Sequence, residues 1–151
     1  MSNYYIKTRS YEVFASKAMK NILDRNCDYR RYCWNQALAL WNDLYSAHQI
    51  YDKICYTTFT PKKNKRSNKL KIIQKDVHLN PSPNWRLVRD RLVEEKEDWQ
   101  FAYSAHLLQL TVQDLGKAWK SFFDKAQPDW GKPHFKSKRA PRQGFKSDQA
   151  K

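Results

Sequence analysis

Residues 106–124, HLLQLTVQDLGKAWKSFFD, contain the clearest secondary-structure pattern in the chain. Apolar side chains recur at steps of four, three, four and three, at Leu108, Val112, Leu115, Trp119 and Phe122. This spacing is typical of a helix packed along one seam against other helices, and it predicts a helix over residues 100–125. Gly116 costs the helix about 1 kcal/mol relative to alanine. Because glycine has no side chain, we expect a close helix crossing at this position. We expect Trp119, Phe122 and Phe123 in the core.

A second helical pattern covers residues 17–53. Ser16 stands where an N-cap belongs, and apolar residues recur at helical spacing at Met19, Ile22, Leu23, Cys33, Ala37, Leu40, Trp41, Leu44 and His48. The pattern fits one helix or two helices that meet near Asn26. A shorter helix is predicted over residues 85–95, with Leu87, Val88, Leu92 and Val93 turned inward. Its charges nearly cancel, so we interpret it as scaffold.

The remaining segments read as a strand and as loops. Residues 3–14 are rich in β-prone side chains, some of them in alternation, which predicts a strand. Residues 57–69 and 80–85 carry prolines and clusters of polar residues, which predicts two breaks in the helical structure. The expected fold class is therefore mainly α, with a helical bundle following an N-terminal strand.

The chain is strongly basic. Its 151 residues carry 29 lysines and arginines against 15 acidic residues, a net charge of +14. A field of this sign attracts polyanions, and nucleic acid is the first candidate. A ribosomal, membrane-surface or heparin-like partner is the alternative.

Two segments concentrate this charge. Residues 62–75 hold seven cations and no acid, including Lys62, Lys63, Lys65 and Arg66. Such a block is a solvated loop, an arm that grips phosphates, or both.

Residues 131–151 hold seven cations and one acid, together with two glycines and two prolines, which predicts an extended segment. Its nucleic-acid candidates are Phe135, Lys136, Lys138, Arg139, Arg142 and Lys146, because cations interleaved with an aromatic ring suit a phosphate backbone with a stacked base. A disordered basic tail is the alternative.

No catalytic or metal-binding pattern is visible. Cys27, Cys33 and Cys55 include no Cys-x-x-Cys pair, and we interpret them as free thiols in a reducing cytoplasm. The four histidines are scattered, without metal-ligand spacing. We therefore expect no cofactor in this chain.

The first residues lack the apolar region of a secretory signal, and no apolar run reaches membrane-spanning length, so no membrane partner is expected.

Three motifs of the sequence resemble those of a known protein family. Residues 29–38, YRRYCWNQAL, resemble the R-x-x-[WYF]-N-x-x-L helix of TnpB (OrfB) transposon proteins. Residues 106–124 are similar to that family's L-Q-x-x-x-x-x-L-x-x-A-[WFY]-x-x-F-F helix. Residues 131–139, GKPHFKSKR, match G-x-P-x-F-K-S-K, and Gly144 and Phe145 stand where an S-F pair usually follows. The motifs occur in the family's order, and the resemblance covers residues 5 to 146.

The resemblance implies an RNA-guided DNA endonuclease related to type V CRISPR effectors. It implies that residues 1–14 form the first strand of a barrel-like wedge domain. Residues 15–130 would then form an inserted helical recognition domain, and residues 131–151 would lead back to the wedge. Guide RNA and double-stranded target DNA are the implied partners, in a bacterial cytoplasm and near the nucleoid. The family reads a short transposon-adjacent motif in duplex DNA. Gln109 aligns with a family glutamine that contacts this motif, and His106 falls where a further DNA contact is common.

The sequence departs from the family pattern where the wedge domain should resume. The RuvC nuclease domain and zinc ribbon of the family are not present, so magnesium and zinc are expected only in that missing part, and the chain by itself is not expected to be an enzyme. A separate polypeptide bearing a RuvC domain is a further implied partner. The alternative from the residues alone is a free-standing basic helical DNA-binding regulator that uses no RNA; a structural RNA-binding protein is a third.

Overall fold

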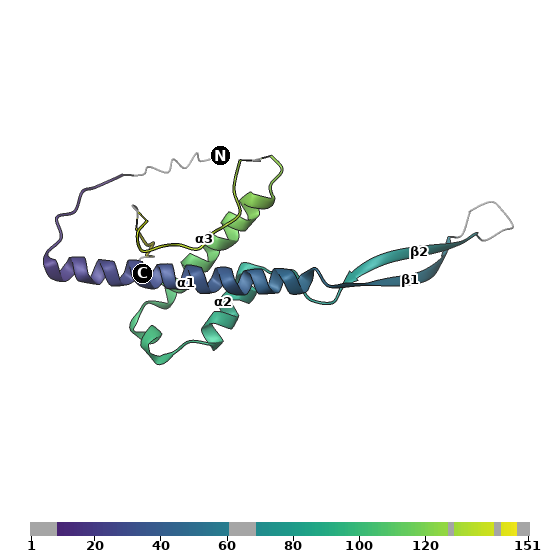
Figure 1. Cartoon of the computed structure of the whole chain (residues 1–151), viewed down its shortest axis with the longest axis horizontal. Coiled ribbons are helices and arrows are strands. Elements are labelled where there is room, and N and C mark those ends of the chain that lie inside the picture. Colours follow the sequence, from purple (N-terminus) through teal and green to yellow (C-terminus); the bar gives the residue numbers. More distant parts are fainter. Residues whose placement is uncertain (1–8, 61–68, 127–128, 141–142, 148–151) are drawn as a thin grey trace, which may run out of the picture.

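The computed structural model describes residues 9–60, 69–126, 129–140 and 143–147, and of these the side chains of residues 56–60 and 69–74 are not described. In this part of the chain the fold is mainly helical, with one two-stranded antiparallel sheet (Figure 1). The elements follow in the order α1 (Lys17–His48), β1 (Tyr51–Thr60), β2 (Lys69–His78), α2 (Trp85–Glu94), the 3₁₀ helix η1 (Asp98–Ala102) and α3 (Ala105–Phe123). The predicted mainly α fold class is confirmed.

Helix α1 is one continuous helix of 32 residues. It begins as predicted at Ser16, whose hydroxyl accepts a hydrogen bond from the Met19 N–H at 3.3 Å. The suggested break near Asn26 is wrong, because no glycine or proline interrupts residues 17–48. The helix also ends earlier than predicted, at His48, and residues 51–53 belong to β1.

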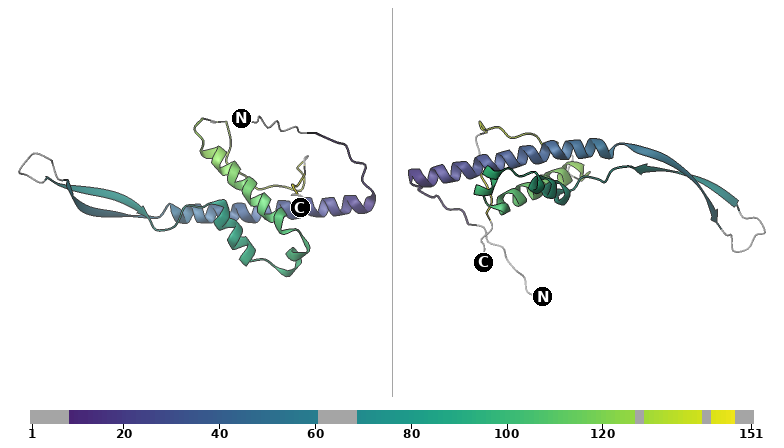
Figure 2. Two further views of the ribbon diagram at one scale, coloured as in Figure 1. Left: turned by 180° about the vertical axis from the view of Figure 1, so that it is seen from behind. Right: turned by 90° about the horizontal axis from the view of Figure 1, so that it is seen from below.

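The core forms where α2 and α3 pack against the middle of α1 (Figure 2). Helix α3 buries Leu108, Val112, Leu115 and Trp119, so this part of the predicted seam is confirmed; α1 contributes Tyr29, Cys33, Trp34, Ala37, Leu38 and Trp41. The prediction is wrong for Phe122 and Phe123, which lie 37% and 52% exposed in the last turn of α3. On α2, Val88 is buried, but Val93 is half exposed and does not point inward as predicted.

Gly116 lies at a close approach between α2 and α3. A Cβ atom at this position would lie 2.9 Å from the Cβ of Trp85. That separation is too short for two carbon atoms, so glycine is what permits the observed packing. The expected close helix crossing at Gly116 is confirmed.

A β-hairpin extends away from the helical bundle (Figures 1 and 2). Its strands pair from Tyr51↔His78 at the base to Thr60↔Lys69 at the far end. The predicted loop over residues 57–69 is therefore wrong at residues 57–60 and at Lys69, which are strand. At the base, the His48 and His78 rings stack with centroids 4.1 Å apart.

The predicted N-terminal strand is absent from residues 9–14, which form neither helix nor strand. Tyr11, Val13 and Phe14 in this segment are mostly exposed. A β-prone sequence forms a strand only when another strand supplies hydrogen-bond partners, and within the described ranges none pairs with this segment. The rest of the predicted first wedge strand, residues 1–8, lies outside the described residues.

Candidate nucleic-acid interface

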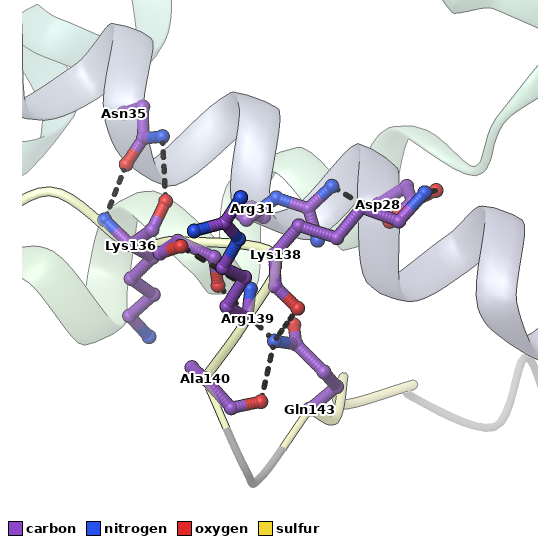
Figure 3. A network of polar contacts seen from close by, with 9 residues as sticks. Asp28, Arg31, Asn35, Lys136, Lys138, Arg139, Ala140 and Gln143 are labelled. Atoms are coloured by element: carbon purple, nitrogen blue, oxygen red, sulfur yellow. Dashed lines mark hydrogen bonds and ion pairs between the residues drawn. The ribbon is translucent and has the colours of Figure 1, made fainter.

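The basic segment after α3 lies along α1 in an extended conformation. We call its described residues, 131–140 and 143–147, the basic strap. They contain no helix or strand, as predicted. Hydrogen bonds from α1 reach the strap at several points, and Figure 3 shows part of this network. The alternative interpretation as a disordered tail is therefore wrong for these residues.

Two neighbouring residues of α1 hold the strap through its backbone. The indole N–H of Trp34 donates a hydrogen bond to the His134 carbonyl oxygen at 2.9 Å. The Asn35 amide nitrogen donates to the Lys136 carbonyl oxygen at 3.1 Å, and the Asn35 amide oxygen accepts from the Lys136 N–H at 2.8 Å. Asn35 therefore joins α1 to both polar backbone atoms of Lys136 in the strap.

An ionic cluster around Asp114 of α3 fixes the end of the strap. The Asp114 carboxylate lies 2.7 Å from the Lys146 ammonium and 3.4 Å from the Arg30 guanidinium. Arg30 also donates to the Gly144 carbonyl oxygen at 2.8 Å. Phe145, between the two strap residues, packs against the core. The cluster therefore joins α1, α3 and the strap.

The strap leaves several predicted contact residues open to solvent. The Phe135 ring is 57% exposed, and the Lys138 side chain is 78% exposed with its ammonium 3.8 Å from the Asp28 carboxylate. The Arg139 guanidinium is exposed and pairs with no acid in the described ranges. A hollow of about 360 Å³ lies between this part of the strap and α1, with Arg30 and Arg31 in its lining.

Lys136 occupies a different environment from the other strap cations. Its ammonium lies 3.8 Å from the centroid of the Trp34 ring. Burial lowers the pKa of Lys136, and Arg30 lowers it further, while Asp114 acts in the opposite direction. Lys136 therefore contributes to the attachment of the strap as well as to its charge.

The predicted α3 residues lie on the surface of the bundle. His106 is exposed and shares a small hollow with Phe145 and Lys146, so the structure brings two predicted contact residues together. Gln109 is half-buried, and its side-chain amide makes no hydrogen bond with another described residue. Gln109, Gln113, Lys117 and Lys120 follow one another at spacings that place them on one side of α3. Our sequence interpretation missed Gln113, Lys117 and Lys120, although their spacing was the available signal.

The other candidates cannot be placed. Lys62, Lys63, Lys65, Arg66 and Arg142 lie outside the described residues. Across the described ranges, no three histidine, cysteine or acidic side chains gather as a metal site would require. No described helix combines the length and apolar character needed to cross a membrane.

The three cysteines differ in environment. Cys33 is buried, and burial raises the pKa of its thiol to about 11, against a partial lowering by the Tyr29 hydroxyl. Burial also raises the pKa of Cys27, which lines the hollow beneath the strap. Cys55 is exposed on the hairpin. None of them forms a disulfide.

Comparison with known protein families, with curated proteins and with solved structures finds no match to this chain.

Proposed function

We propose that this chain binds nucleic acid as the recognition part of a TnpB-like RNA-guided DNA endonuclease, holding guide RNA and double-stranded target DNA. In this proposal the nuclease activity belongs to a RuvC domain that a separate polypeptide supplies. The site of action is the bacterial nucleoid. The motif resemblance supplies the identity of the partners, and the basic strap supplies the physical support.

The observation that carries the proposal is the attachment of the strap to α1. A disordered basic tail neutralises phosphates without defined geometry. The strap instead has its backbone fixed by Trp34 and Asn35, and it presents Phe135, Lys138 and Arg139 to solvent. A preordered row of cations with an exposed ring loses less conformational entropy on binding a phosphate backbone.

Helix α3 adds a second element to the proposed interface. The Gln109 amide has the donor and acceptor needed to pair with adenine in a DNA major groove. Since this side-chain amide makes no hydrogen bond with another described residue, pairing with adenine would break none there. Lys117 and Lys120, two and three turns further along, supply cations for the adjacent phosphates.

Salt-dependent binding tests the proposal. Affinity of the full chain for RNA and for duplex DNA would be measured over a salt series. Replacing Lys138→Ala and Arg139→Ala together should weaken binding and make log affinity less steep in log salt by about 0.7 to 0.9 per lost phosphate contact. The matched control is Lys20→Ala with Arg25→Ala at the exposed start of α1, which lowers the net charge equally.

Two results would contradict the proposal. Equal effects of both double substitutions would mean that only overall charge matters. Recovery of duplex DNA without any discrete RNA, when the chain is purified from its host and the bound nucleic acid is sequenced, would favour the free-standing DNA-binding regulator.

A further inference from the structure

A groove lined by aromatic rings lies where α1, α2 and α3 meet, and no described strap residue is part of its lining. We call it the aromatic groove and define it by the rings of Trp41, Tyr45, Trp85, Trp119 and Phe123. Its volume is about 280 Å³. Gly116 also lines it, so α3 presents bare backbone to the groove at this point.

Four of the five rings are nearly parallel. Trp41 stacks on Trp119 with an interplanar angle of 7° and centroids 5.9 Å apart. Trp119 stacks on Phe123 at 21° and 5.6 Å, and Phe123 stacks on Tyr45 at 29° and 5.9 Å. Phe123, which is 52% exposed, is the most accessible member of this stack. A further flat ring that enters the groove would therefore extend a stack that already exists.

The charges around the groove are positive. Lys120 is its one charged lining residue among the described residues. A second hollow of about 370 Å³ shares Trp85, Gly116 and Lys120 with the groove and adds Lys117. The Lys132 ammonium lies 5.5 Å from the centroid of the Trp119 ring. Neither hollow has an acidic residue in its described lining, so the surface suits a flat aromatic group that carries an anion.

We propose that the aromatic groove binds one unstacked base of a single-stranded nucleic acid, with the base against Phe123 and the adjoining phosphate at Lys120 and Lys117. A base and its phosphate combine the flat ring and the negative charge that the groove and its cations match. An apolar peptide helix would leave both lysines without an anionic partner. The inference rests on the proposed function, to which it adds a base-binding site distinct from the strap and from Gln109.

The test compares two short strands. One is an oligouridylate with a single central adenosine, and the other carries an abasic residue at that position; each is made as RNA and as DNA. The native chain should bind the adenosine strand more tightly than the abasic strand. Phe123→Leu keeps apolar volume and removes the ring, so it should weaken binding of the adenosine strand on the order of tenfold and leave the abasic strand unchanged.

Phe122→Leu is the matched control. Phe122 neighbours Phe123 and contacts Trp119 edge-on, but it does not line the groove, so both strands should bind this variant as they bind the native chain. Lys120→Ala should weaken both strands and make the salt dependence less steep by about one contact, 0.7 in the logarithmic slope. Circular dichroism and thermal unfolding would verify that each variant is folded. The RNA and DNA forms decide which sugar the groove accepts.

Several outcomes would overturn the inference. Equal affinity of the native chain for the adenosine and abasic strands would exclude a base site while leaving salt-dependent binding, and hence the proposed function, intact. Equal losses in Phe122→Leu and Phe123→Leu would point to general destabilisation. A dimer in sedimentation analysis that dissociates in Phe123→Leu would assign the groove to a second copy of the chain. If the native chain binds neither strand nor duplex DNA, both proposals fail.

Discussion

Asn35 spans the backbone of Lys136 with both ends of its amide, one as donor and one as acceptor. The two residues are 101 positions apart in the chain, so this pair closes a large loop between α1 and the strap. An asparagine amide can do this because its nitrogen donates to the carbonyl oxygen and its oxygen accepts from the N–H of a single extended residue. The strap is thus positioned by a side chain of α1.

Replacing Asn35→Ala should detach the middle of the strap. Two hydrogen bonds are lost and the Lys136 backbone must find water, so we expect the free energy of unfolding to fall by about 1–3 kcal/mol. Hydrogen exchange of the Lys136 amide should accelerate by more than exchange in α3. The neighbouring Gln36→Ala, at an exposed position of α1, should leave both measurements unchanged. Unaltered exchange of the Lys136 amide in Asn35→Ala would show that the two hydrogen bonds between Asn35 and Lys136 do not form in solution.

Gly116→Ala should destabilise the contact between α2 and α3. The added methyl group would lie 2.9 Å from the Trp85 Cβ, and overpacking of this kind costs about 1–3 kcal/mol. The gain of about 1 kcal/mol in helix propensity offsets part of that cost. Thermal unfolding should therefore show a lower midpoint. Gly131→Ala is the control, because a Cβ there meets nothing within 4 Å; a more stable Gly116→Ala would contradict the observed packing.

The buried thiol of Cys33 should make the fold less stable in alkali. Its pKa is about 11 in the fold and 9.0 when unperturbed, so between these values the unfolded chain releases a proton that the folded chain retains. The stabilisation is complete below pH 9 and is lost as pH rises toward 11, up to roughly 2–3 kcal/mol. Urea unfolding at a series of pH values measures this fall.

Substitution of Cys33 provides the control for that measurement. Cys33→Ala should make the decline above pH 9 shallower, whereas Cys55→Ala, on the exposed hairpin, should not. An alkylating reagent at pH 8 should modify Cys55 first and Cys33 last. Rapid labelling of Cys33 in the folded chain would be inconsistent with its burial.

The histidine pair at the hairpin base should fix how the hairpin meets α1. The Nδ1 of His48 lies 2.8 Å from the Asn80 carbonyl oxygen, and the Nδ1 of His78 lies 2.6 Å from the His48 carbonyl oxygen. A carbonyl oxygen only accepts, so both rings carry their proton on Nδ1. His78→Ala removes one of these bonds and the ring stack, and spin labels on α1 and the hairpin should then report a broader distance distribution. His106→Ala, exposed on α3, should leave the distribution narrow.

Much of the helical framework was predictable because it depends on local periodicity. The steps from Leu108 to Trp119 define one buried face, and the cap at Ser16 needs only residues within one turn. Phe122 and Phe123 continued the same pattern and were assigned to the core. Their exposure depends on where the partner helices stop, which no local pattern encodes.

The hairpin and the strap attachment were harder to predict because both depend on distant partners. Residues 69–78 contain Ile72, Ile73 and Val77, but the surrounding lysines obscured a strand whose partner lies in Tyr51–Thr60. In the opposite case, Tyr11 and Val13 carry a strand-like composition without a paired strand in the described ranges. The strap was recognised as extended and basic, yet only the structure reveals that Trp34 and Asn35 hold its backbone.

The uninterrupted course of α1 has a mechanical consequence. At 1.5 Å per residue, its 32 residues form a rod about 48 Å long, with the hairpin leaving one end and the strap lying against its middle. A helix without glycine or proline resists bending, so α1 keeps the base of the hairpin and the strap at a fixed separation.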